Sequence, residues 1–138
     1  MSETFDPAGD GWRALPGAAL PSGIGIPWSK RVDGHWRYGL LTAAAHANPA
    51  GAVHGGVLMT FADHGLSMLA WEAAGRLACA TIQLNGHFLN AVRPGAFVEL
   101  TGEVTRRGSG LVFVRGLLRV ADRDVVAADG IWRVLKPA

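Results

Sequence analysis

The sequence contains a single cysteine, Cys79, and this scarcity excludes several kinds of protein. No intrachain disulfide can form, and no metal site can be built from cysteine thiolates. A chain without disulfides suits a reducing compartment, so we expect a cytoplasmic protein. The amino terminus has no basic segment followed by an apolar stretch, and no apolar run is long enough to span a bilayer. We therefore expect neither a signal peptide nor a membrane-spanning segment.

Charged residues are also scarce, at 17% of the chain, whereas hydrophobic residues make up 49%. The formal net charge is only +2, and the basic residues are scattered. So weak a positive charge does not support nucleic-acid binding. At 138 residues the chain is long enough for one domain with a substantial core. The low charged fraction predicts that a second subunit covers part of the apolar surface.

The first quarter of the chain is rich in glycine and proline, so regular structure there should be short and broken. It nevertheless carries large apolar side chains, including Trp12 and Trp28, which are unusual in a free tail. We predict an N-terminal arm, residues 1–34, packed on a domain formed by residues 35–138. One interpretation of this arm is a lid near the functional site.

The rest of the chain predicts one helix among strands. A strand is expected from His35 to about Ala45, and a helix from about Gly55 to Ala74 that Gly75 terminates. Four strand-like segments with short connections follow, as in antiparallel hairpins: 78–90, 97–106, 111–120 and 125–134. Because the helix is apolar on most sides, a curved sheet must cover it. The expected fold is α+β, with one antiparallel sheet around a central helix.

Alternation in the strand at residues 78–90 predicts two distinct faces. One face should carry Thr81, Gln83, Asn85 and His87, and the other Ile82, Leu84 and Phe88.

The segment from Asn48 to Asp63 is the most informative part of the sequence. Paired glycines, Gly55 and Gly56, follow His54 and open the apolar helix, and Asp63 is the only carboxylate in its first half. An ionised acid on a buried helix is costly unless a partner neutralises it or the chemistry requires it. Asp63 is therefore either a structural acid or a catalytic one, and we favour catalysis.

Helix geometry limits how these groups can cooperate. The rise from His54 to Asp63 is about 13 Å, beyond hydrogen-bond reach within one chain. Either the two groups serve unrelated purposes, or a second helix runs antiparallel alongside in a two-fold dimer. We favour a shared site, in which the Gly-Gly helix start of one subunit faces Asp63 of its partner.

Several residues together resemble the hotdog-fold acyl-CoA thioesterases, in particular the PaaI-like subgroup of phenylacetate degradation. The resemblance rests on four features in the order that this family shows: Asn48 with Gly51, the block Val53–Leu58 with Asp63, Thr81, and the run Phe88–Gly95. It covers the chain from about His35 to the C-terminus. The arm adds nothing to it.

The resemblance implies a cofactor-independent thioesterase that hydrolyses acyl- or aryl-acyl-CoA to the free acid and CoA, without a metal. The backbone N–H of Gly55 would polarise the thioester carbonyl at the positive end of the helix. Asp63 of the partner would act as nucleophile or as general base, and both roles stay open. Thr81 would orient the carboxylate or the water. The implied assembly is a homodimer that pairs further into a tetramer.

The resemblance also implies supporting roles. Asn48 and His54 would position the water or hold the loop, although Asn48 could simply form a turn before Pro49 and His54 could be structural. Candidates for binding the substrate and its CoA phosphates are Gly56, Arg93, Arg106 and Arg107.

Two other functions are compatible with the same outline. A hotdog hydratase or dehydratase would generally need a His with an Asp or Glu around a differently spaced helix start, which this sequence lacks. A non-catalytic acyl-CoA-binding module would tend to lose the helix carboxylate, which is present here as Asp63. The acyl group and the choice between CoA and carrier-protein thioesters are not encoded in any recognisable motif.

Overall fold

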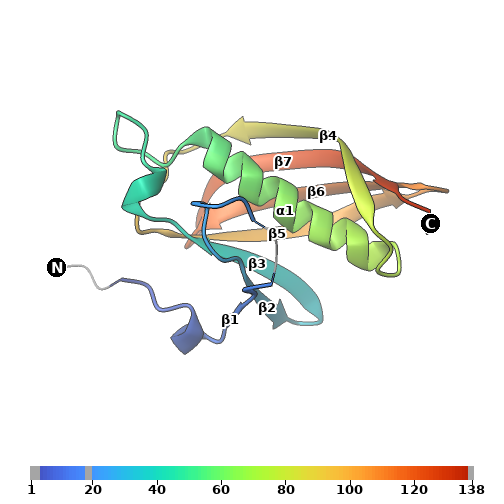
Figure 1. Ribbon diagram of the computed structural model, residues 1–138, viewed down its shortest axis with the longest axis horizontal. Helices are drawn as coiled ribbons and strands as arrows, with labels where there is room; N and C mark the ends of the chain where they lie inside the picture. Colours follow the sequence, from blue (N-terminus) through green and yellow to red (C-terminus); the bar gives the residue numbers. More distant parts are fainter. Residues whose placement is uncertain (1–3, 18–19, 137–138) are drawn as a thin grey trace.

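The computed structural model describes residues 4–17 and 20–136, so predictions for residues 1–3, 18–19 and 137–138 lie outside it. One helix, α1 (Gly55–Ala73), lies across an antiparallel sheet whose seven described strands run in the order β1-β2-β3-β5-β6-β7-β4 (Figure 1). The strands are β1 (Arg13–Ala14), β2 (Trp28–Val32), β3 (His35–Leu41), β4 (Cys79–Phe88), β5 (Phe97–Arg107), β6 (Leu111–Val120) and β7 (Arg123–Val134). Two short 3-10 turns, η1 (Ala8–Asp10) and η2 (Ala44–His46), complete the regular structure of these residues.

The α+β prediction, a curved antiparallel sheet around one long helix, is confirmed. The helix starts at Gly55 and ends within a residue of the expected position, with Gly75 in the left-handed conformation (φ +67°) just beyond it. No helix among the described residues is long and apolar enough to cross a membrane.

The arm contributes two strands that the sequence analysis missed. β2 pairs with β3 along its whole length, from Trp28 opposite Gly39 to Val32 opposite His35. The connection is Asp33-Gly34, and both residues have positive φ (51° and 79°), as a type I′ hairpin turn requires. The Asp-Gly pair was a readable hairpin signal, hidden by the high glycine and proline content of its surroundings.

β3 is shorter than predicted, ending at Leu41 instead of near Ala45. The chain turns at Thr42, whose hydroxyl donates to the Ala96 carbonyl at 2.6 Å, and then forms η2. An alanine-rich segment without glycine or proline gives no local signal for this turn, because its cause is a contact with a distant residue.

A row of very small residues lets α1 approach the sheet closely. Gly102 on β5, Gly116 on β6, Ala128 on β7 and Gly86 on β4 are neighbours in register across four strands. A Cβ added at Gly116 would lie 2.8 Å from Leu66 of the helix and 2.6 Å from the Thr101 carbonyl oxygen. Large side chains in this row would push the helix away from the sheet.

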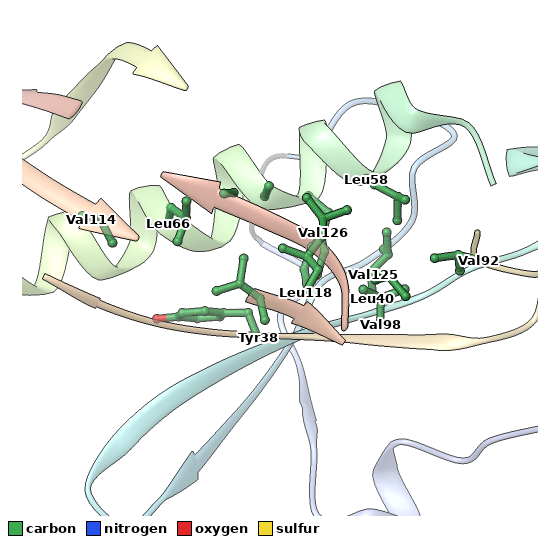
Figure 2. Packing of buried hydrophobic residues seen from close by; sticks show 14 of the residues in the cluster. Tyr38, Leu40, Leu58, Leu66, Val92, Val98, Val114, Leu118, Val125 and Val126 are labelled. Atoms are coloured by element: carbon green, nitrogen blue, oxygen red, sulfur yellow. The ribbon is translucent and has the colours of Figure 1, made fainter. Parts of the chain in front are cut away.

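The hydrophobic core fills the space between the helix and the sheet on both sides of this row. Leu58 and Leu66 project from α1 towards Tyr38 and Leu40 of β3 and towards valines of β5 to β7 (Figure 2). Trp132 of β7 is fully buried, and its indole N–H donates to the Ser67 hydroxyl at 2.8 Å. Burial of this apolar surface is the main force that holds α1 in place.

The predicted faces of β4 are wrong at one point, because the strand contains a β-bulge. Thr81 lies opposite Trp132, yet Gln83 lies opposite Ile131, so Ile82 is the extra residue. Thr81 therefore faces the helix, where it bonds Asp63, while Gln83, Asn85 and His87 line a groove on the other face of the sheet.

The arm lies against both faces of the sheet. On the face away from α1, Phe5 stacks on Phe97 with ring centroids 4.7 Å apart, and Trp12 meets the same ring edge-on at 5.0 Å. On the helix side, Leu20 and Ile24 pack against the core. The division of the chain into an arm of residues 1–34 and a domain of residues 35–138 stays a prediction.

We predict that Gly116→Ala destabilises the protein by about 1–3 kcal/mol, the usual cost of overpacking a dense interior. The added methyl group has to displace both a backbone carbonyl and Leu66. Urea unfolding measures the change. The matched control is Gly108→Ala, where the nearest atom would be 3.9 Å away. Equal unfolding midpoints for the two variants would contradict the close-approach argument.

Candidate active site

Asp63 is half-buried in the middle of α1 and has one hydrogen-bond partner among the described residues. The Thr81 hydroxyl of β4 donates to Asp63 Oδ1 at 2.7 Å. The bond leaves Oδ2 without a partner in the described residues, and it fixes the orientation of the carboxylate. The structure thus joins Asp63 and Thr81, which the resemblance linked, within one chain.

The start of α1 presents free backbone donors. The N–H groups of Val57 and Leu58 already donate to the His54 carbonyl, and the His54 side chain does not cap the helix. The N–H groups of Gly55 and Gly56 find no acceptor among the described residues. Unpaired N–H groups at the positive end of a helix favour an anionic or strongly polarised oxygen.

The peptide leading into the helix is held by two other backbone hydrogen bonds. Val53 N–H donates to the Val92 carbonyl at 2.8 Å, and His54 N–H donates to the His46 carbonyl at 2.9 Å. These bonds set the direction in which the following Gly55 N–H points.

Asn48 organises the preceding loop through its side chain. Its Oδ1 accepts hydrogen bonds from the Ala50 and Ala52 N–H groups, at 2.9 and 3.1 Å. This is the side-chain turn that the sequence analysis held as one of two interpretations. The exposed His54 ring has no hydrogen bond among the described residues.

A cavity of about 310 Å³ opens beside the first turn of α1. Gly55 lies in its wall, and a Cβ at that position would approach the Phe88 ring to 3.1 Å. The remaining lining is almost entirely apolar and comes from the helix, the residue two positions before it and the segment after β4: Leu58, Val53, Leu89, Asn90, Ala91 and Val92. The free Gly55 N–H therefore lies beside a mostly apolar cavity.

The two halves of the candidate site do not meet within one chain. Gly55 and Asp63 lie on the same helix, about 12 Å apart along its axis at 1.5 Å per residue. A helix cannot fold back to bring them together.

The three candidate arginines also separate into two groups. Arg93 directly follows the cavity residue Val92, near the start of the helix. Arg106 and Arg107 end β5 at its far end, and the charge of Arg107 acts on Cys79, where β4 begins. A single chain therefore does not gather these three side chains around one phosphate.

Three groups in the described part of the chain have displaced pKa values. Burial lowers the pKa of His64, against the opposing influence of Asp63, and the His64 Nε2 is buried with no partner among the described residues. Burial, assisted by the charge of Glu72, raises the pKa of Tyr38 to about 12. Burial also raises the pKa of Cys79, although Arg107 acts in the opposite direction. A neutral, partly buried Cys79 is a poor nucleophile.

Within residues 4–17 and 20–136, no three His, Cys, Asp or Glu side chains gather where they could hold a metal ion. That catalysis needs neither a metal nor a cofactor stays a prediction.

Phe88 and Leu89 were not predicted as cavity residues, nor His46 as a support of the helix start. Phe88 and Leu89 are exposed by 55% and 50%. A run of apolar residues at the end of an edge strand was visible in the sequence, but nothing linked it to Gly55, which is distant in the chain.

Comparison with known proteins identifies relatives of this chain. The family model described as "Thioesterase superfamily" matches residues 50–127. A Pseudomonas aeruginosa protein named "Putative esterase PA0474" is 30% identical over 90 residues, covering 64% of this chain and 67% of the relative.

Solved structures agree with this match. A phenylacetic acid degradation-related protein of Ralstonia eutropha, described as a putative thioesterase, superposes with a TM-score of 0.68 at 27% identity, covering 77% of this chain and 83% of its own. A Bacillus halodurans protein solved with CoA has the same fold, with a TM-score of 0.67 at 20% identity over 80% of this chain and 74% of its own.

We predict that His64 makes the protein acid-sensitive. A folded-state pKa below the unfolded value of about 6.5 means that the unfolded chain binds the proton first. Stability is therefore lost as pH falls from about 6.5 towards the lowered pKa, by about 1.4 kcal/mol per unit of displacement.

Urea unfolding of the protein and of His64→Leu at several pH values between 7.5 and 5 measures this loss. His64→Leu should lose less stability over that range, whereas the control His35→Leu, at an exposed site, should behave like the parent. An unchanged pH dependence in His64→Leu would refute the assignment.

Proposed function

Because this chain belongs to the thioesterase superfamily and is a thioester hydrolase, we propose that it cleaves acyl- or aryl-acyl-CoA thioesters into the free acid and CoA. The observation that supports this most directly is the pair of unpaired N–H groups at Gly55 and Gly56, the first of which lies in the wall of an apolar cavity. Thioester hydrolysis places negative charge on the carbonyl oxygen, and such donors stabilise that charge.

In the proposed mechanism, the thioester carbonyl oxygen binds to the Gly55 N–H. Glycine at this position lets the reacting group approach the backbone closely. A side chain here would also crowd the Phe88 ring. The positive end of α1 then favours the tetrahedral intermediate over the ground state.

The carboxylate comes from Asp63 of a second subunit, since the distance along α1 rules out the same chain. As nucleophile, Asp63 would attack the carbonyl carbon and expel the CoA thiolate, and water would then hydrolyse the anhydride. As general base, it would remove a proton from an attacking water. The Thr81 hydroxyl occupies Oδ1 in both cases, so Oδ2 is the oxygen that reacts.

The exposed side of β4 supports the proposed dimer. β4 pairs with β7 on one side only and is an edge of the described sheet. Large apolar side chains along it and directly after it are exposed by about half: Ile82 (51%), Phe88 (55%) and Leu89 (50%). Unpaired strand edges with apolar side chains readily pair with another chain. A second β4, related by a two-fold axis, would bury these side chains and run the two helices antiparallel.

The proposed dimer would bring the candidate arginines of two subunits to the same substrate. Antiparallel subunits place the far end of one β5 towards the helix start of the other. We propose that Arg93 of one subunit and Arg106 or Arg107 of its partner contact the CoA phosphates, with Gly56 beside the thioester. Guanidinium groups form strong paired hydrogen bonds with phosphate. Further pairing of dimers into tetramers is part of the same proposal.

The first test of this function is thiol release from a panel of acyl- and aryl-acyl-CoA esters. We expect Asp63→Asn and Asp63→Ala to lower kcat by at least about 10²-fold, because each removes the reacting carboxylate. Thr81→Val, which removes only the orienting hydrogen bond, should cost less. Turnover that survives both Asp63 substitutions would exclude Asp63 from the mechanism. CoA-ester binding by the parent without thiol release would identify a binding module instead.

The second test removes the proposed Gly55 donor without disturbing the helix. Gly55 is the first residue of α1, where proline is tolerated, and His54 has the extended ψ of 135° that a following proline requires. Gly55→Pro deletes the N–H, whereas the control Gly55→Ala keeps it and adds a similar Cβ. We expect kcat of Gly55→Pro to fall about 10²–10³-fold below that of Gly55→Ala.

Mixing the two inactive variants shows whether the site is shared between subunits. Gly55→Pro and Asp63→Asn subunits, unfolded together and refolded as random dimers, should regain about a quarter of the parent sites, since half the dimers are mixed and each has one intact site. A mixture no more active than its components would place both groups in one chain and refute the shared site.

A further inference from the structure

His46 occupies a buried position between the arm and the loop that leads into α1. It closes the 3-10 turn η2, and only 5% of the residue is exposed. Its ring makes two hydrogen bonds, one to the nearby Ala43 and one to Gly23 of the arm. Nδ1 accepts from the Ala43 N–H at 3.0 Å, and Nε2 lies 2.8 Å from the Gly23 carbonyl oxygen of the arm.

These two partners fix the tautomer of the ring. An N–H group can only donate, so Nδ1 carries no proton, and a carbonyl can only accept, so Nε2 carries one. The ring is therefore a neutral imidazole that links η2 to the arm. No other residue type places an acceptor and a donor at these two positions on a rigid ring.

The backbone of the same residue holds the start of the helix. The His46 carbonyl accepts the N–H of His54, the residue immediately before Gly55. On the other side, Val53 N–H is fixed to the Val92 carbonyl. The peptide that orients the Gly55 N–H is thus held by Val92, in the segment between β4 and β5, on one side and by His46 on the other.

A turn at Gly23 brings the arm into contact with His46. Gly23 has a φ of +90°, a conformation that other residues adopt only with strain, and this turn presents its carbonyl to the ring. The neighbouring Ile24 packs against the core and anchors the segment. The contact therefore joins two ordered parts of the protein.

We propose that His46 is a positioning residue through which the N-terminal arm sets the orientation of the Gly55 and Gly56 N–H groups. The ring is hydrogen-bonded to Gly23 of the arm and to η2, which fixes the position of His46. The His46 carbonyl accepts the His54 N–H and so holds the peptide before the first turn of α1. The inference rests on the proposed function for its kinetic consequence, but its structural part stands on the hydrogen bonds alone.

Two substitutions separate the functions of the two ring nitrogens. In His46→Gln the side-chain N–H group reaches the place of Nε2 and can donate to Gly23. In His46→Asn the side-chain oxygen takes the place of Nδ1, but the side chain is too short to reach the arm. We expect kcat to fall on the order of tenfold in His46→Asn with little change in KM, since misplaced donors weaken transition-state binding. His46→Gln should retain most of the activity.

A double-mutant cycle tests the link to the arm. Gly23→Ala strains the turn that presents the carbonyl and should lower kcat by itself. Combined with His46→Asn it should add nothing further, because the same bond is already broken. The matched control is Gly34→Ala, which also alters a glycine of positive φ (+79°) with open space around it, in a hairpin away from His46. Its effect should combine additively with His46→Asn.

Amide hydrogen exchange provides a readout that does not depend on turnover. In His46→Asn the N–H of His54 should exchange at least several-fold faster than in the parent, while amides of the β6–β7 hairpin keep their rates. Unchanged kcat and unchanged exchange at His54, or additive effects with Gly23→Ala, would overturn the proposal. If the parent protein released no thiol from any ester, the proposed function would fail, and His54 exchange would still decide the role of His46.

Discussion

The rigidity of α1 is the constraint on which the candidate site depends. Gly55 and Asp63 lie about 12 Å apart along one helix, and no change of side-chain conformation can close that distance. The groups suited to polarise a carbonyl and to attack it are therefore held apart within each chain. In the proposed dimer, a symmetric partner would complete two sites, because each antiparallel helix would supply the group that the other lacks. The apolar edge at β4 would then belong to the active site as well as to the interface between subunits.

The position of α1 is set by residues with almost no side chain. Gly86, Gly102 and Gly116 with Ala128 form the row beneath the helix, and Gly65 of α1 leaves room for Leu100 in the same way. This close approach brings Asp63 within reach of the Thr81 hydroxyl on β4. The bulge at Ile82 is equally necessary, since without it Thr81 would face the opposite side of the sheet. Packing and catalytic geometry thus depend on the same contacts.

The first turn of α1 has unpaired donors, and the loop before it and the N-terminal arm hold that turn in place. The first turn of α1 leaves its donors free next to an apolar cavity, at some cost in stability, because a capping side chain would satisfy one of them. Sites that bind or react commonly retain such unsatisfied groups. The surrounding loop compensates with its own bonds: Asn48 closes the turn, and His46 joins it to the arm. The N-terminal segment, which looked irregular in the sequence, is thereby part of the support for the site.

The sequence by itself determined the α+β fold, the helix with its terminating glycine, and the family, because periodicity, turn residues and the Asn48–Asp63 motif are local signals. It also singled out Asp63 and Thr81, which the structure joins. Only the tertiary structure decided which face Thr81 occupies, that Phe88 borders Gly55, and that His46 meets Gly23. The bulge, the cavity and the buried histidine arise from contacts between segments distant in the chain, and local patterns carry no information about such pairings.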